Sequence, residues 1–481
     1  MELIDGLRRI LPPDAVLADV ESMRPYECDG LSAYRQLPRA VVIPRAAEQV
    51  RAVLRLCHRL NIPVVARGAG TGLSGGALPH ADGVLLSLAR FNRILDIDPL
   101  ARTATLEPGV RNLAISEAAA RHGLYYAPDP SSQIACTIGG NVAENSGGVH
   151  CLKYGLTVNN VLGVKALTAD GEWLIAGGGA LDGPGYDLTA LLNGSEGMLA
   201  VIMEVTVRLL PRPPGVRVML AAFDRVEDAG ETVAAIIAAG IVPAGLEMMD
   251  RLAIRAVEAF IHAGYPLDAE AILLCELDGL SAELEVQTER VRGLFLAHGG
   301  RDIRVAQDEA ECRKLWAGRK AAFPAVGRLS PDYYCIDGTI PRRELARVLG
   351  RIGELSARYG NAVANVFHAG DGNLHPLILY DANRPGELEK VERLGSAILE
   401  LCIEVGGTVT GEHGVGMEKL GPMCSQYGDD ERELFHAVKA AFDPNGLLNP
   451  GKAVPTLARC AEYGAMHVHG GRLPFPDIER F

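Results

Sequence analysis

The sequence has few aromatic residues, no cysteines in a Cys-x-x-Cys pair and no long apolar run. Phe, Trp and Tyr make up 5% of its 481 residues, and its ten cysteines are scattered. The missing cysteine pairs argue against a zinc knuckle or an iron–sulfur cluster within this chain, so we expect free, buried thiols in a reducing compartment. The longest charge-free run, residues 232–246, falls short of the roughly 20 residues that a membrane helix needs.

No targeting segment is recognisable at the start of the chain. Pro12, Pro13 and Asp14 interrupt the apolar residues that follow Arg8 and Arg9, so the pattern is neither a signal peptide nor a twin-arginine signal. We therefore expect a cytoplasmic protein, at most peripheral at the inner face of the plasma membrane.

Positive charge is also scarce, whereas glycine is abundant. Lys and Arg number 47 against 60 Asp and Glu, a net charge of −13, which argues against nucleic acid as a partner. The 55 glycines exceed the usual share of about 7% of a chain. A folded chain this rich in glycine needs many tight turns or close approaches of backbone to a bound molecule.

The pattern of predicted helices and strands, together with the positions of proline and glycine, divides the chain into five segments. A short helix and connector occupy residues 1–35, and strands alternate with helices over 36–214, where Pro211, Pro213 and Pro214 mark a boundary. The next segment, 215–404, has three predicted strands (217–223, 271–277 and 335–340) and three predicted helices (226–239, 282–298 and 342–359). This alternation predicts a four- or five-stranded antiparallel sheet with helices on one face. Glycine returns in 405–455, which suggests that the chain comes back to the first site, and 456–481 is a tail in which residues 466–471 alternate like a strand.

Three loops of the second segment are dense in glycine: 67–76, 139–148 and 193–197. The first contains Gly-x-Gly-x-x-Gly, but Pro79 and an Asp-Gly turn follow it where the dinucleotide fingerprint requires a helix. Residues 446–452 fit the P-loop string, yet Ala453 stands where that loop needs Ser or Thr. We interpret the glycine loops as backbone donors that wrap a diphosphate, with a flexible surface loop as the alternative.

Two histidines flank an Asp-Gly dipeptide between two apolar runs. If Asp371 and Gly372 form a two-residue hairpin turn, His368 lies directly opposite His375, with Cβ atoms about 4.5–5.5 Å apart. That separation suits two imidazoles on one metal ion, although a polar sheet face is the alternative. Glu412 and His413, adjacent in a Gly-rich turn, would add an oxygen ligand and a free base, or be a structural loop.

These segments resemble the FAD-binding domain of the vanillyl-alcohol oxidase/PCMH flavoprotein family. The whole chain, from residues 26–30 onward, resembles that family's FAD-linked (D) subunits of bacterial glycolate oxidases. The resemblance implies an α+β fold: a PCMH-type FAD-binding domain of two subdomains over 36–214, an α/β cap domain with an antiparallel sheet over 215–404, and a C-terminal return to the flavin site over 405–455. Because the first glycine loop has no histidine, the implied FAD is held non-covalently.

The same resemblance assigns roles residue by residue. His368, His375 and Glu412 would hold a divalent metal, Zn or Mn, and His413 would be the catalytic acid/base. Trp316–Lys320 resembles a helix start whose Arg319 binds the substrate carboxylate, with a solvated helix face as the alternative, and Tyr334 either lines that pocket or packs. The FAD-binding residues would be Arg67, Gly68, Gly70, Thr71, Gly72, Ser74, Gly75, Pro128, Asp129, Ser132, Gly139, Gly140, Asn141, Asn145, Gly148, Glu196, Gly197, Ile202 and Asn449.

The implied reaction is FAD-dependent oxidation of a small 2-hydroxy acid, glycolate first and D-lactate second, to the 2-oxo acid. Electrons would pass to a second FAD-domain-like subunit and an iron–sulfur subunit, and from there towards the quinone pool. Two alternatives stay open: a stand-alone dehydrogenase of D-lactate or D-2-hydroxyglutarate, and a non-catalytic flavin-binding scaffold.

Overall fold

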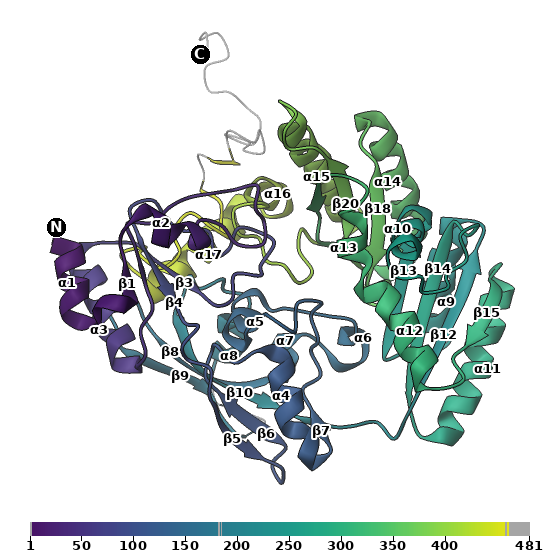
Figure 1. The fold of residues 1–481 in the computed structure, drawn as a ribbon, viewed down its shortest axis with the longest axis horizontal. Helices are drawn as coiled ribbons and strands as arrows, with labels where there is room; N and C mark the ends of the chain where they lie inside the picture. Colours follow the sequence, from purple (N-terminus) through teal and green to yellow (C-terminus); the bar gives the residue numbers. More distant parts are fainter. Residues whose placement is uncertain (1, 181–182, 184, 457–458, 461–481) are drawn as a thin grey trace.

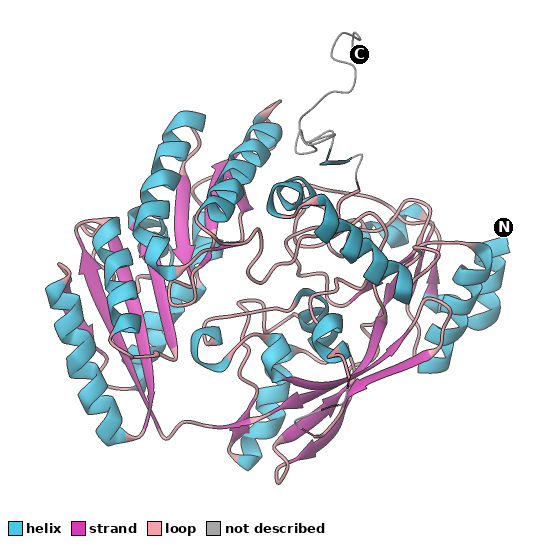
Figure 2. Cartoon of the chain, turned by 180° about the vertical axis from the view of Figure 1, so that it is seen from behind, coloured by secondary structure: helices cyan, strands magenta, loops and turns pink. Residues whose placement is uncertain are grey.

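The computed structural model describes residues 2–180, 183, 185–456 and 459–460. Its secondary structure is mixed, and the strands of the described residues gather into three larger sheets and two short pairs (Figures 1 and 2). The strands are β1 (Val16–Leu17), β2 (Ala40–Val42), β3 (Val64–Arg67), β4 (Val84–Ser87), β5 (Ile94–Asp98), β6 (Thr103–Leu106), β7 (Leu124–Tyr125), β8 (Val161–Leu167), β9 (Trp173–Gly177), β10 (Val201–Arg208), β11 (Leu210–Pro211), β12 (Gly215–Phe223), β13 (Gly245–Asp250), β14 (Ala271–Gly279), β15 (Arg301–Val305), β16 (Asp332–Cys335), β17 (Gly338–Thr339), β18 (Val363–Phe367), β19 (Asn373–Leu374) and β20 (Pro376–Tyr380).

Helices cover these sheets and connect their strands. They are α1 (Glu2–Ile10), α2 (Val20–Met23), α3 (Ala47–Leu60), α4 (Asn112–Ala119), α5 (Ile138–Glu144), α6 (Cys151–Tyr154), α7 (Thr157–Asn160), α8 (Leu188–Leu192), α9 (Val226–Ala238), α10 (Arg251–Ile261), α11 (Ser281–Ala297), α12 (Glu309–Lys320), α13 (Ala322–Val326), α14 (Leu345–Tyr359), α15 (Glu387–Glu404), α16 (Leu420–Gln426) and α17 (Asp429–Phe442), with short 3₁₀ turns at Pro13–Ala15, Arg24–Tyr26, Ala120–His122 and Arg342–Glu344. Within the described residues, no helix is long and apolar enough to cross a bilayer.

One half of the molecule contains two sheets. The first has the order β1-β2-β4-β3, and its β2, β4 and β3 run parallel. Strand β4 is buried along its whole length, as expected for a parallel strand covered on both faces. The second sheet is antiparallel with the order β5-β6-β10-β8-β9, and α4, α5 and α8 contribute side chains to the core on one of its faces. Two sheets with separate cores agree with the two subdomains that the resemblance implies.

The other half is built on one antiparallel sheet with the order β15-β12-β14-β13-β18-β20-β16. Alternate residues of β12 point to opposite faces: Met219, Ala221 and Phe223 join a core with α9, α11, α14 and α15, whereas Val218 and Leu220 join a core with α10, α12 and α13. The prediction of four or five strands with helices on one face is therefore wrong. The sheet has seven strands in the described chain, and both faces are covered (Figure 1).

The strand that sequence reasoning missed most consequentially is β13. Its sequence, GLEMMD, carries two acidic residues, so it does not have the apolar pattern of a core strand. Both are nevertheless buried: Glu247 pairs with Arg319, and Asp250 caps α10 by accepting the Ala253 N–H. A buried carboxylate is tolerated only when it is paired or hydrogen-bonded, and such partners are invisible in a single strand's pattern.

The C-terminal segment does return to the first half. Leu448 forms a parallel bridge with Val64 of β3, through Val64 N–H to Leu447 O at 2.8 Å and Asn449 N–H to Val64 O at 2.8 Å. Cys424 and Cys460 form a disulfide, which corrects the expectation that all cysteines are free; the other eight cysteines are free thiols. The predicted strand-like alternation at 466–471 lies outside the described residues.

Candidate active site

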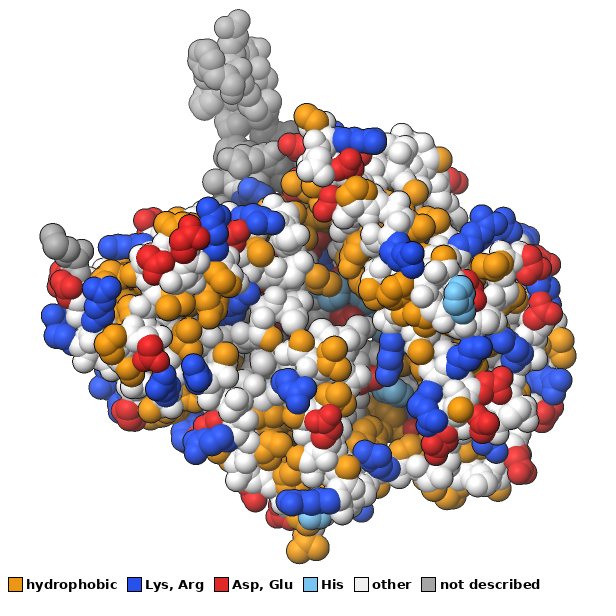
Figure 3. All heavy atoms as spheres, in the orientation of Figure 1, with side chains coloured by type: hydrophobic (Ala, Val, Ile, Leu, Met, Phe, Trp, Pro, Cys, Tyr) orange, Lys and Arg blue, Asp and Glu red, His pale blue; other side chains and the backbone are white. Residues whose placement is uncertain are grey.

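A cavity of about 370 Å³ lies between the glycine loops of the first half and the loops of the second. Its walls combine residues from 66–73, 130–146 and 196–202 with Lys320, Phe323, two of the predicted metal ligands, His375 and Glu412, and the predicted acid/base, His413. Figure 3 shows the surface hollowed between the two halves. The volume is typical of a site that holds a small molecule or cofactor.

The first wall is mainly backbone. Gly70 adopts φ +71°, which favours glycine, and a side chain there would overlap the Arg67 guanidinium. At Gly197, φ is +68° and no described atom would lie within 4 Å of an added Cβ, so its side-chain position is open space. Thr137 also lines the cavity, and its buried hydroxyl has no hydrogen-bond partner within the described part of the chain. A wall of bare backbone with an unpaired hydroxyl fits a ligand rich in oxygen acceptors, such as the diphosphate of FAD.

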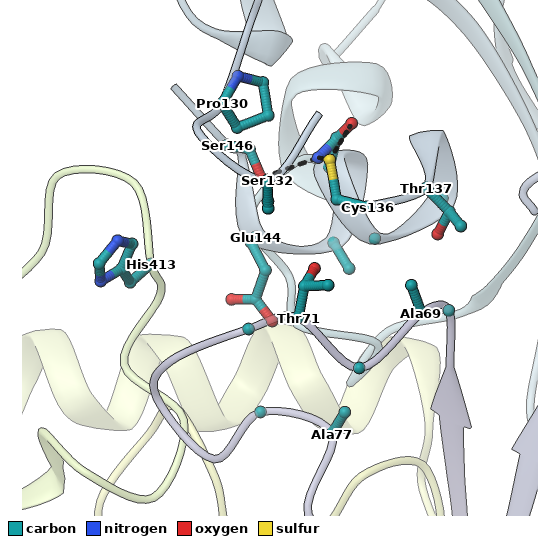
Figure 4. Close-up of a pocket in the computed structure, with 18 of the residues that line it drawn as sticks. Ala69, Thr71, Ala77, Pro130, Ser132, Cys136, Thr137, Glu144, Ser146 and His413 are labelled. Carbon is teal, nitrogen blue, oxygen red and sulfur yellow. Dashed lines mark hydrogen bonds between the residues drawn. The ribbon is translucent and has the colours of Figure 1, made fainter. Parts of the chain in front are cut away.

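Twelve of the predicted FAD residues line this cavity. They are Arg67, Gly68, Gly70, Thr71, Gly72, Ser132, Gly139, Gly140, Asn141, Glu196, Gly197 and Ile202. The Asn141 amide is already engaged, since it donates to Ser146 Oγ at 3.2 Å and accepts from Asn112 at 3.1 Å. Figure 4 shows Glu144, Thr71 and Ala69 on the wall that faces His413.

The remaining predicted FAD residues shape the loops rather than the cavity surface. Asn449 donates to the carbonyls of Gly76 at 3.0 Å and Glu196 at 2.6 Å, and so ties the first glycine loop to the third. Asp129 accepts from the backbone N–H of His150 at 3.1 Å and contacts its ring at 2.8 Å. The full set outside the cavity lining is Ser74, Gly75, Pro128, Asp129, Asn145, Gly148 and Asn449. Their direct contact with FAD stays a prediction.

The second wall begins at the predicted histidine hairpin, whose register differs from the expectation. His368 pairs with Asn373, not with His375, because β18 and β20 join through a longer turn. The two-residue shift leaves His375 on the same face, since side chains alternate with a period of two. The two imidazole centroids therefore still lie 5.0 Å apart.

Glu412 completes this cluster from the loop between α15 and α16. Its Oε1 lies 3.3 Å from His368 Nε2 and 2.9 Å from His375 Nε2, and the three potential ligand atoms fall within 4.8 Å of one another. Although burial opposes it, hydrogen bonding to both histidines holds the pKa of Glu412 well below its usual value. A carboxylate and two imidazoles converging in a buried place form a donor set that suits a divalent cation.

A carboxylate behind His368 fixes the orientation of its ring. Glu247 Oε1 lies 2.9 Å from His368 Nδ1, while Glu247 Oε2 accepts from Arg319 Nε at 2.7 Å. Burial opposes protonation of His368, but the Glu247 carboxylate raises the pKa of that imidazole well above its usual value. Metal-bound histidines commonly donate their second ring nitrogen to a carboxylate in this way. Sequence reasoning missed Glu247, because no spacing links β13 to the hairpin.

Asp337, between β16 and β17, was also missed and is the hub of the second wall. Its fully buried carboxylate accepts backbone N–H groups from Gly411, Glu412 and His413 at 3.0–3.3 Å. It also accepts from Asn373 Nδ2 at 2.7 Å and Lys419 Nζ at 2.9 Å. Although burial works against ionisation, the Lys419 ammonium holds the pKa of Asp337 well below its ordinary range. One carboxylate thus joins the hairpin to the loop that carries Glu412 and His413.

His413 stands where the two walls meet. Its ring stacks on His375 with centroids 5.0 Å apart, and its buried Nδ1 has no hydrogen-bond partner among the residues described. Burial lowers the pKa of His413 to about 4. Across the cavity, burial and then the neighbouring Glu196 carboxylate raise the pKa of Glu144 well above its usual value. An uncharged imidazole with a free nitrogen is able to accept a proton.

The two predicted substrate residues lie elsewhere. Arg319 is 2% exposed and ends α12 rather than starting it, and its guanidinium faces Glu247 instead of the cavity. Its role as substrate anchor stays a prediction, but the cavity-lining cation of this segment is Lys320. Tyr334 lines a separate cavity of about 140 Å³ with Tyr34 and Glu418 and is not part of the lining of the first cavity. Its role as a substrate residue stays a prediction.

Comparisons with known proteins agree with this architecture. Residues 38–177 match the model of an FAD binding domain, and residues 212–453 match that of FAD linked oxidases, C-terminal domain. p-Cresol methylhydroxylase with substrate bound is structurally similar, with a TM-score of 0.79 at 19% identity over 95% of this chain and 97% of that chain. At that identity the likeness supports the fold alone.

The chain belongs to the FAD-linked oxidases, an FAD-dependent oxidoreductase family. It is 66% identical to the glycolate oxidase subunit GlcD of Escherichia coli K12, over 99% of this chain and 95% of that protein. The Bacillus subtilis GlcD subunit is 40% identical over 90% of this chain and 93% of its own length. A D-lactate dehydrogenase of Anaerostipes hadrus is 33% identical over 94% and 97%.

Proposed function

We propose that this chain oxidises glycolate, and more slowly D-lactate, to the corresponding 2-oxo acid with non-covalent FAD as hydride acceptor. The observation that carries the proposal is the shared cavity, in which a glycine-backbone wall faces His375, Glu412 and His413 across one space. Its GlcD relatives, named as glycolate oxidase subunits, favour glycolate over D-lactate.

FAD would lie against the glycine wall, with its diphosphate near residues 68–72 and 139–140. When bound, FAD supplies an acceptor for the hydride that leaves the substrate α-carbon. The positive φ of Gly70 and the open side-chain position at Gly197 let backbone approach the cofactor closely. Arg67 faces the same loop, and its guanidinium donates to the Cys28 carbonyl at 2.6 Å, which holds it beside the cofactor site.

His368, His375 and Glu412 would hold a divalent ion, Zn²⁺ or Mn²⁺. The protonated His368 between Glu247 and Glu412 carries a positive charge where the ion would sit, so metal binding would replace that proton. A divalent ion at this place supplies Lewis acidity towards a substrate hydroxyl. Glu247 would keep His368 in the tautomer that presents Nε2 to the ion.

The remaining roles belong to His413 and Lys320. His413 would accept the hydroxyl proton, because it lines the cavity and its Nδ1 is unpaired in the described chain. The Lys320 ammonium, which also lines the cavity, would attract the substrate carboxylate. Arg319, which the resemblance names for that task, would reach the substrate only by leaving Glu247.

Electron transfer beyond FAD would require partner subunits. The name of the GlcD relatives, a subunit of glycolate oxidase, favours assembly with other subunits. We propose that these are a second FAD-domain-like subunit and an iron–sulfur subunit, as the resemblance implies. We propose that the protein lies in the cytoplasm, at most peripheral at the inner face of the plasma membrane. Eight of its ten cysteines are free, as is typical of a reducing compartment, and the Cys424–Cys460 disulfide is the exception.

A substrate panel with an artificial dye as acceptor tests the proposal and its main alternative. Glycolate should have the highest kcat/KM, followed by D-lactate, with D-2-hydroxyglutarate far behind. A preference for D-2-hydroxyglutarate, or for D-lactate over glycolate, would instead support a stand-alone dehydrogenase of that acid. Metal analysis of the same preparation should find about one divalent ion per chain, and Glu412→Gln should lose it.

A further inference from the structure

A second ligand set shares His375 with the proposed metal site. Cys335, the last residue of β16, offers its Sγ beside His375 and His413, and the three potential ligand atoms lie within 4.8 Å of one another. Cys335 pairs with Leu377 of β20, which lies two residues after His375 in the sequence. This pairing fixes the thiol beside the start of β20. All three side chains are buried or nearly so.

Each of the two histidines in this set has an unused ring nitrogen. His375 directs Nε2 to Glu412 at 2.9 Å, which leaves its Nδ1 buried and without a partner among the described residues. His413 Nδ1 is likewise buried and has no hydrogen-bond partner among the described residues. Among the described residues, the hydrogen bond of the Cys335 thiol is a long one of 3.7 Å to the Ile336 carbonyl. Unpaired buried polar atoms are costly, and two beside a free thiol indicate a place that can accept a ligand.

We propose that Cys335, His375 and His413 form a binding site for a thiophilic metal ion such as Zn²⁺ or Cd²⁺, and that its occupancy inhibits the enzyme. On binding, a metal–sulfur bond forms and the thiol proton passes to solvent, while His413 gives a lone pair and no redox change occurs. When the first site is also occupied, His375 binds one ion through each ring nitrogen as an imidazolate, and its ring proton passes to solvent as well. Inhibition rests on the proposed function, because the ion takes the nitrogen of His413 that would accept the substrate proton. Metal binding itself does not rest on it.

Ligand chemistry separates the two sites. Thiolate and imidazole select zinc and other soft or borderline ions, whereas a carboxylate with imidazoles also accepts the harder Mn²⁺. Zinc holds thiolate at about 2.3 Å and imidazole at about 2.0–2.1 Å, so the ligand atoms need to approach to roughly 3.5 Å of one another. The loop that carries His413 and the ring of His375 would make that small contraction. Access is from the cavity, which His375 and His413 both line.

X-ray absorption at the zinc edge tests the site without relying on turnover. Holoenzyme loaded with FAD and Mn²⁺ receives one equivalent of Zn²⁺. We expect one sulfur at about 2.3 Å and nitrogen at about 2.0–2.1 Å in the wild type. The sulfur should be absent in Cys335→Ser and retained in Cys312→Ser, the matched control that removes a partly exposed thiol. A zinc shell without sulfur in the wild type, or sulfur that persists in Cys335→Ser, overturns the proposal.

A second variant and an inhibition assay complete the design. His413→Gln should weaken zinc binding by at least about tenfold, as expected when one ligand is lost, and unchanged affinity would contradict the site even if Cys335→Ser does not fold. With glycolate as substrate, the zinc concentration that halves activity should rise at least about tenfold in Cys335→Ser. If the wild type oxidises no 2-hydroxy acid, the proposed function fails, while the zinc–sulfur distance still decides the metal site.

Discussion

The two walls of the cavity differ in the chemical groups that they present. The wall from the first half presents backbone and small side chains, and its key conformations are positive φ angles at Gly70 and Gly197. The wall from the second half presents His375, Glu412 and His413, while His368 is absent from the cavity lining and contacts Glu412. Buried carboxylates hold these side chains. The first wall can match the shape of a cofactor, whereas the second can bind a cation and move a proton.

The walls also differ in how they are supported. The glycine loops are tied by several separate contacts. These are the Asn449 hydrogen bonds, each worth about 1 kcal/mol net, the buried Lys452 ammonium on Gly76, and the Glu196 carboxylate, which accepts from Val415 and Gly416. The loop that carries Glu412 and His413 instead converges on one buried charge, Asp337, which Lys419 neutralises. Substitutions in the first wall should therefore weaken cofactor binding gradually. Substitutions in the second wall should abolish turnover or lower the stability of the fold.

The largest effect is expected at His413. His413→Asn should lower kcat for glycolate by about 10²- to 10⁴-fold, because the proton acceptor is lost. FAD content should stay normal, since the glycine wall is untouched. Steady-state kinetics and the flavin absorbance of the purified variant check both parts. Undiminished turnover would remove His413 from the reaction.

Asp337→Asn should destabilise the protein by about 3–5 kcal/mol, the usual cost of removing one partner of a buried ion pair. Chemical denaturation measures this, and metal content should fall with it because Glu412 and His413 lose their shared anchor. Asp443→Asn is the matched control: it breaks another buried pair, with Lys439 at 2.6 Å, away from the cavity. If Asp443→Asn loses as much metal as Asp337→Asn, the result contradicts the specific role of Asp337 in holding the loop of Glu412 and His413.

The low pKa of His413 predicts how stability depends on pH. In the folded chain that pKa is about 4, against 6.5 for the free side chain, so the unfolded state binds the extra proton between these values. The uncharged His413 therefore contributes up to about 3 kcal/mol to the free energy of unfolding. This contribution is fully present above pH 6.5 and is lost as the pH falls through 4. Denaturation of chelator-treated protein from pH 4 to 7 should show a shallower slope for His413→Asn, and parallel slopes would contradict the assignment.

The substrate anchor can be decided between two neighbouring residues. If Lys320 binds the carboxylate, Lys320→Ala should raise KM for glycolate by a factor equivalent to about 1.5–3 kcal/mol, the worth of a charged hydrogen bond. Metal content should not change, because within the described part of the chain Glu247 forms its ion pairs with Arg319 and His368 and not with Lys320. If Arg319 is the anchor instead, Arg319→Lys will raise KM and Lys320→Ala will not.

The smallest effect is expected on the backbone wall. Gly70→Ala places a side chain in the left-handed region, which costs about 1–2 kcal/mol, and pushes on Arg67. FAD should bind roughly 5- to 30-fold more weakly, as measured by fluorescence titration of the deflavinated protein. Gly293→Ala, in α11 with no described atom within 4 Å of its added Cβ, is the control and should bind FAD normally. Equal affinities in both variants would argue against a backbone-lined cofactor site.

Local patterns predicted the first wall well and the second only in part. Glycine is concentrated in uninterrupted stretches of sequence, so the loops at 67–76 and 139–148 were found from sequence. Residues of both loops line the cavity. The histidine pair was found despite a wrong register, because a shift of two residues preserves the face of a strand. Glu247, Asp337 and Lys419 were not found, since each is a lone charged residue whose partners come from distant segments.

The central claim is that the glycine wall and the histidine wall act on one molecule of FAD and one of substrate. Anaerobic mixing of the FAD-loaded chain with glycolate tests it most directly, because the flavin is then the sole electron acceptor. We predict that glycolate bleaches the flavin fully in the wild type and hundreds of times more slowly in His413→Asn, in line with the value of a general base of about 10²- to 10⁴-fold. Bound FAD that neither glycolate nor D-lactate bleaches would contradict the account and identify a flavin-binding scaffold instead.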